Sequence, residues 1–163
     1  MAAVPVVFNE VLNLQQLGVP ETSIKHGLTS MQSDKWIVAV EPTQVTLVDL
    51  QNGAQVTRRP IQAEAAIMNP SSSILALRSG TTLQVFDLDK KAKLKSFTMP
   101  EALVYWKWTS STNLALITGT AVYHWGLAGA SDPVKMFDRH QSVGLNCQII
   151  NYHVSPDQKW CLL

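Results

Sequence analysis

The residues of this sequence best suited to chemistry are an alternating segment and the lysines that follow it. In Thr82–Phe86, an extended backbone would place Thr82, Gln84 and Phe86 on one face. The lysines after the next turn are Lys90, Lys91, Lys93 and Lys95, and the last three share a face if their segment is extended. Such a surface suits an extended ligand with leucines and a carboxylate. Taken alone, the residues favour a plainer interpretation, a solvated hairpin end with scattered lysines.

The sequence shows no catalytic, metal-binding or cofactor-binding pattern. The four histidines lack metal-ligand spacing with one another or with cysteines and carboxylates. Since His124 lies in a strand pattern, it is better explained as a packed side chain than as a ligand. No serine or cysteine motif accompanies the triplet Asp138–His140, and no glycine-rich phosphate loop occurs. We therefore predict that the chain is not an enzyme and holds no metal or cofactor.

Composition bounds the class of protein. The chain has 163 residues, of which 46% are hydrophobic and 15% charged, so it can form one domain with a core. A net charge of +1 is too balanced for binding nucleic acid by overall attraction. The uncharged stretch between Lys107 and Asp132 is interrupted by polar residues, which argues against a membrane span. Cys147 and Cys161 are interpreted as reduced thiols of a cytosolic protein.

Internal repetition indicates how these residues are positioned. Three units, near 33–61, 69–99 and 108–139, each hold an apolar strand, a turn, a second strand and a weaker third strand. The first strands are expected at Trp36–Val40, Ile74–Leu77 and Leu114–Ile117, and the second strands at Val45–Leu50, Thr82–Leu88 and Ala121–Trp125. A fourth unit begins near 155, with its first strand at Trp160–Leu163.

This spacing predicts an all-β fold built from the blades of a β-propeller, which take roughly 40–50 residues each. A β-sandwich also has short strands and turns, but its strands do not recur as units. Chance similarity among amphipathic strands is the remaining alternative. We expect an incomplete β-propeller, with three blades and the first strand of a fourth. Because the sequence stops on an apolar strand, we expect a fragment of a longer protein.

Several longer segments have an unusual composition. They are LNLQQLGVP, SDKWI, RRPIQAEAAIMNP, TLQVFDL, PVKMFDRH and CQIINY. In this order, and over almost the whole chain, they resemble the N-terminal domain of the clathrin heavy chain family. The resemblance implies a seven-bladed propeller at the tip of a helical leg, in a cytoplasmic coat on pits and vesicles. It implies endocytic and Golgi adaptor proteins as partners, bound through short linear motifs, with the membrane reached only through them. Trimerisation would belong to a distant part of the parent protein.

The resemblance also implies a peptide groove between the first two blades, for acidic-leucine motifs. The polar contacts that it carries over are Arg59, Thr82, Gln84, Lys91 and Lys93, and the apolar lining is Leu47, Leu75 and Phe86. One lining position is Thr57, where the family usually has isoleucine, and this departure would weaken a leucine pocket.

A second family site, for tryptophan-bearing motifs, falls on Gln148, Ile150 and Trp160. The alternative for Trp160 is a core strand residue like Trp36, and His26 stands where the family has phenylalanine.

Two rival functions remain open. The first is another propeller scaffold of a coat or regulatory complex, which would be indifferent to acidic-leucine peptides. The second is a hydrolase whose catalytic residues lie outside this segment.

Overall fold

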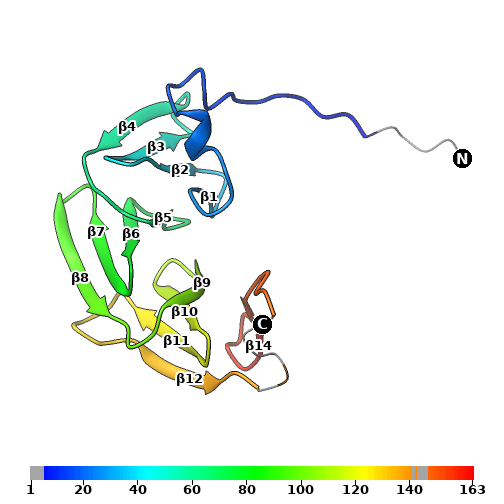
Figure 1. Ribbon diagram of the computed structural model, residues 1–163, viewed down its shortest axis with the longest axis vertical. Helices are drawn as coiled ribbons and strands as arrows, with labels where there is room; N and C mark the ends of the chain where they lie inside the picture. The colour runs from blue at the N-terminus through cyan, green and yellow to red at the C-terminus, as the bar shows by residue number, and fades with distance from the viewer. Residues whose placement is uncertain (1–5, 141, 143–146) are drawn as a thin grey trace, which may run out of the picture.

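The computed structural model describes residues 6–140, 142 and 147–163. Three four-stranded antiparallel sheets and one two-stranded sheet follow one another along the chain (Figure 1). A single 3-10 turn, η1 (Glu21–Ser23), precedes the first sheet. Within the described part of the chain, the fold is therefore all-β, as predicted.

Each of the three large sheets is a meander of consecutive strands, and we call them the first, second and third blades. The first blade comprises β1 (Thr29–Met31), β2 (Trp36–Val40), β3 (Val45–Asp49) and β4 (Gln55–Arg59). The second comprises β5 (Ala65–Met68), β6 (Ile74–Ser79), β7 (Thr82–Asp87) and β8 (Ala92–Thr98). The third comprises β9 (Leu103–Trp108), β10 (Asn113–Thr118), β11 (Ala121–Gly126) and β12 (Val134–Asp138). The fourth sheet pairs β13 (His153–Val154) with β14 (Cys161–Leu162).

The blades contain one strand more than the three-strand units described from the sequence. In each case the additional strand comes first, as β1, β5 or β9, and lies on the inner side of the arc of blades in Figure 1. The first two of these strands have only three and four residues, so they carry little periodicity. In the fourth sheet, β13 likewise precedes the strand expected at Trp160–Leu163.

In the first and second blades, aspartate side chains close the turn that follows the third strand. In the first blade, the Asp49 carboxylate accepts the backbone N–H of Gln51 at 3.0 Å. In the second blade, Asp87 accepts the N–H of Asp89 at 3.1 Å. A carboxylate that accepts an N–H two residues ahead favours a tight turn, because it replaces a backbone hydrogen bond. Equivalent positions of the repeat thus perform the same local function.

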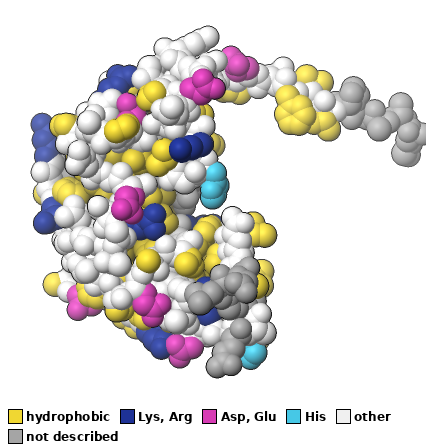
Figure 2. All heavy atoms as spheres, in the orientation of Figure 1, with side chains coloured by type: hydrophobic (Ala, Val, Ile, Leu, Met, Phe, Trp, Pro, Cys, Tyr) yellow, Lys and Arg dark blue, Asp and Glu magenta, His cyan; other side chains and the backbone are white. Residues whose placement is uncertain are grey.

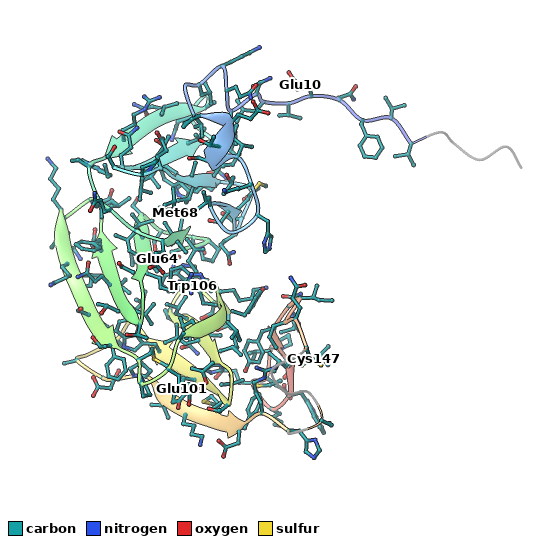
Figure 3. All side chains as sticks on the ribbon, viewed as in Figure 1. Glu10, Glu64, Met68, Glu101, Trp106 and Cys147 are labelled. Carbon is teal, nitrogen blue, oxygen red and sulfur yellow. The ribbon has the colours of Figure 1, made fainter. Side chains whose placement is uncertain are left out.

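The core lies between consecutive blades rather than inside one sheet. Strand β6 sends Leu75 and Leu77 into a cluster shared with the first blade, and Ala76 into a cluster shared with the third. Because side chains alternate along a strand, each blade buries both of its faces. Met68, labelled in Figure 3, is 1% exposed and belongs to the cluster between the first two blades. The order of the blades along the chain therefore sets which faces meet.

We expect Leu75→Ala to lower the free energy of unfolding by about 2–5 kcal/mol, because it leaves a cavity between two blades. Leu75 is 0% exposed. The matched control is Leu94→Ala on β8, where leucine is 40% exposed and the loss should stay within about 0.5 kcal/mol. Urea denaturation followed by circular dichroism measures both. Equal losses in the two variants would contradict the interblade core.

Candidate functional site

The residues predicted to form a peptide groove meet between the first and second blades. We call the surface where β3 and β4 face the second blade the first seam. Leu47 and Leu75 are 1% and 0% exposed and belong to one apolar cluster, and Phe86 packs against it half-buried. The two leucines therefore form the floor beneath the seam, and Phe86 is the apolar side chain of the three that a ligand can touch.

Strand β4 forms one wall of the first seam. Thr57 pairs with Leu47 and Arg59 with Val45, so both side chains lie on the face of the sheet that these buried residues occupy. Both are half-buried. The Nε of Arg59 is buried and has no hydrogen-bond partner within the described residues.

Strand β7 forms the other wall. Leu83 and Val85 are buried toward the third blade, while Thr82, Gln84 and Phe86 are half-buried on the opposite face, as the alternation predicts. The hydroxyl of Thr82 lies 3.3 Å from that of Thr98 on β8. Beside Thr82 and Gln84 lies a cavity of about 240 Å³, also lined by Gln62 and Arg78. This wall therefore offers an amide and hydroxyls next to an aromatic ring.

The lysines do not share one face, and that expectation is wrong. Strand β8 carries a bulge, so that Phe86 pairs with Lys93 whereas Val85 pairs with Lys95. Partners directly opposite each other lie on the same face, so Lys93 faces the first seam and Lys95 the third blade. Lys91 is not extended; it lies in the turn with a φ of 53°.

Charge at the first seam is mostly positive. Lys90 pairs with Asp87 at 3.2 Å, and the pKa of that carboxyl is lowered, chiefly because the backbone N–H of Lys90 donates to it. Within the described residues, no salt bridge involves Lys91 or Lys93, and both are exposed. Figure 2 shows Lys and Arg side chains along this outer edge. An acidic ligand would therefore meet cations that the fold has not already neutralised.

The second predicted site comes together only in part. Gln148 and Ile150 line a cavity of about 390 Å³ with Cys147, His153 and other residues near the fourth sheet. Trp160 does not line this cavity. Its side chain is 76% exposed, so the alternative that Trp160 is a core residue like Trp36 is not met in this structure. Ile150 also borders the central hollow seen in Figure 2, a cavity of about 370 Å³ whose lining includes His26.

A histidine–tyrosine pair joins the third blade to the segment before β13. His124 Nε2 lies 2.9 Å from the hydroxyl of Tyr152, and the two rings meet edge to face. Tyr152 is 1% exposed, and burial raises the pKa of its hydroxyl. Burial lowers the pKa of His124. The sequence indicated a packed histidine, but it gave no signal for the partner because Tyr152 lies outside any periodic segment.

The described residues contain no group of three histidine, cysteine, aspartate or glutamate side chains that could hold a metal ion. In the same part of the chain, no helix has the length and apolar character needed to cross a bilayer.

Solved structures with a similar fold are distant in sequence. Kluyveromyces lactis Hsv2 aligns with a TM-score of 0.56 at 11% identity, over 68% of this chain and 37% of that one. The same protein with loop 6CD replaced by a Gly-Ser linker aligns equally well, at 12% identity over 68% and 40% of the two chains. At this identity the likeness concerns the fold alone. Together with the consecutive four-stranded sheets described above, this similarity of fold defines the chain as part of a β-propeller.

Curated relatives identify the family. Human clathrin heavy chain 2 is 47% identical over 98% of this chain and 10% of its own length. The Drosophila melanogaster clathrin heavy chain is 45% identical over the same shares, and a probable clathrin heavy chain 1 of Caenorhabditis elegans is 47% identical over 99% of this chain. No protein-family model matches. The chain is therefore a homologue of the clathrin heavy chains, and it spans about a tenth of the length of these relatives.

We expect the free energy of unfolding to fall as the pH falls below about 6.5. The pKa of His124 lies below its usual 6.5 in the folded state because of burial, so protons bind the unfolded chain more readily. The contribution of the neutral His124 imidazole to the free energy of unfolding is complete above about pH 6.5. It is lost as the pH falls from there toward the lowered pKa of the folded state. Urea unfolding at about pH 7.5 and 5.5 measures this loss. In His124→Gln the pH dependence should be weaker, and an unchanged dependence would contradict the assignment.

Proposed function

We propose that the first seam docks short acidic-leucine motifs of adaptor proteins, and that the chain serves a vesicle coat in this way. The proposal rests on the family, whose curated members are clathrin heavy chains, and on the chemistry of the seam. The observation that carries it is the position of Phe86. This ring shares a face of β7 with Thr82 and Gln84, and Lys93 lies directly opposite it on β8.

An extended peptide fits this seam for three physical reasons. Leucines would cover the exposed part of the Phe86 ring, which removes apolar surface from water. The Gln84 amide and the Thr82 hydroxyl can bond the main chain of an extended segment. Lys91, Lys93 and Arg59 can pair with acidic side chains at the rim.

The cellular setting follows from the same proposal. The chain would act in clathrin-mediated endocytosis and Golgi-derived vesicle traffic, on the cytoplasmic face of coated pits and vesicles. Adaptors from both routes would be its partners, and contact with the membrane would pass through them. Trimerisation would lie elsewhere in the parent protein.

A second docking surface is favoured by the cavity of about 390 Å³ that Gln148 and Ile150 line. Ile150 is 88% exposed and Leu162 73% exposed, so an aromatic side chain could cover both. This surface would take a tryptophan-bearing motif. Trp160 would contribute only after a change of position, because it lies outside the cavity lining.

We expect a labelled peptide with two leucines, a spaced third leucine and acidic flanks to bind saturably and to weaken as salt rises. Gln84→Ala and Lys93→Glu should each weaken binding about tenfold, because each removes a contact from the seam. Fluorescence anisotropy gives the Kd, and circular dichroism confirms that each variant is folded.

The matched control is Lys159→Glu, which makes the same change of charge on a lysine that is 76% exposed next to β14. It should bind like the parent. A folded parent that does not bind, or a control weakened as much as Lys93→Glu, would place the docking function elsewhere.

We expect Thr57→Ile to tighten binding of the same peptide about threefold to tenfold, because added methyl groups extend the apolar wall opposite Phe86. Thr57→Val isolates the effect of the hydroxyl, since valine has the same shape as threonine. Unchanged affinity in the isoleucine variant would show that this wall does not touch the ligand.

A further inference from the structure

The side chain of Lys95 crosses from the second blade to the third. Its ammonium donates to the carbonyl of Gly126 at 2.6 Å, and to those of Ser131 at 3.3 Å and Ala128 at 3.4 Å. It also lies 5.9 Å from the ring centroid of Trp125, whose indole N–H donates to the same Ser131 carbonyl at 3.0 Å. Carbonyls and an aromatic ring thus lie around the charge, and these contacts hold the loop after β11 against β8.

The register of the hairpins gives Lys95 an equivalent position in each blade. The central hairpins end at the pairs Trp36–Asp49, Ile74–Asp87 and Asn113–Gly126. Leu47, Val85 and His124 each lie two residues before the second member of their pair. Their partners on the outermost strands are Thr57, Lys95 and Val134, respectively. At this one position, the first blade therefore presents a threonine to the next sheet, the second blade a lysine and the third blade a valine.

Thr57 and Val134 do not line the cavities beside the first seam and the third blade. One cavity, of about 240 Å³, is lined by residues of β6 and β7 and by Gln62 and Ala63, which lie between the first two blades. Another, of about 190 Å³, lies between the third blade and the fourth sheet, and His124 and Cys161 are in its lining. Between the second and third blades, the corresponding space is crossed by the Lys95 side chain and its carbonyl partners.

We propose that this one register position determines whether the surface between two blades is open to a ligand. Lys95 closes the surface between the second and third blades by binding the chain's own carbonyls, and Thr57 leaves the first seam open. The part that concerns Thr57 rests on the peptide-docking function proposed above. The part that concerns Lys95 stands without it.

The second blade could accept a lysine from position 57 as the third blade accepts Lys95. Asp87 occupies the hairpin position that Gly126 occupies in the third blade. By the alternation of β7, the Asp87 side chain lies on the face toward the third blade, with Ile74, Leu83 and Val85. An ammonium extended from position 57 would therefore meet the backbone oxygens at this end of the hairpin, as Lys95 meets those of the third blade.

The first experiment follows the indole N–H of Trp125 by NMR in the parent, Lys95→Met and Lys95→Arg. The signal is assigned by its loss in Trp125→Phe. We expect the Met variant to shift the signal and to raise its exchange with water about tenfold, because the carbonyl partners lose their shared cation. The Arg variant should preserve it, since it keeps the charge and the donors. An unchanged signal in Lys95→Met would overturn the closure.

The second experiment compares Thr57→Lys with Gln51→Lys, which adds the same charge in the exposed turn after β3. Simple attraction predicts that both lysines strengthen binding of the acidic-leucine peptide. Closure predicts that Thr57→Lys weakens it at least about tenfold while Gln51→Lys does not. It also predicts shifted amide signals of Asp89 and Lys90, which donate to Asp87.

The outcomes separate the two proposals. If the folded parent binds no peptide, the docking function falls, and closure is judged by the Trp125, Asp89 and Lys90 signals alone. If Thr57→Lys binds as tightly as the parent and leaves the amide signals unchanged, the proposed role of this position is wrong.

Discussion

Burial of apolar side chains between consecutive sheets is the constraint on which the rest of this structure depends. A four-stranded sheet with two apolar faces is not stable alone, because its apolar side chains would stay in water. Leu114 and Leu116 therefore pack toward the second blade, while Ala115 and Ile117 pack toward Tyr152 and the following segment. The same alternation explains why the central strands are nearly continuous apolar runs and why the polar side chains gather at the outer strands. The first seam is a surface that this packing creates, where two blades meet at their rims.

In the first seam, some residues pack the core and others are accessible to a ligand. Leu47 and Leu75 are inaccessible to a ligand, but their packing sets the separation of the walls that carry Thr57 and Gln84. Phe86 belongs to both layers, since it packs on the floor and remains half-exposed. Affinity and stability are therefore linked at this ring, and substitutions there would change both. The side chains of Lys91 and Lys93 are exposed, so substitutions there should change affinity more than stability.

Sequence periodicity predicted the central strands and the face of β7 on which Thr82, Gln84 and Phe86 lie. It succeeded there because β2 is an apolar run of five residues and β7 buries alternate residues, Leu83 and Val85, over a length of six. It failed for β1 and β5, which are too short for a period to show. The placement of Lys95 also escaped it, since a bulge depends on how β8 pairs with β7 and not on the residues of β8 alone. The Tyr152 contact with His124 joins positions far apart in the chain, and no local pattern records it.

The bulge in β8 has a consequence for how related sequences should be compared. Because it holds one more residue than its partner strand requires, Lys93 and Lys95 look interchangeable in the sequence but serve opposite sides of the blade. A relative that lacks the residue between them would have two adjacent lysines on a regular strand, and these would still face opposite sides. A relative that keeps this residue but forms no bulge would place both lysines on one face, so a search for equivalent lysines should align the strand pairing before the letters.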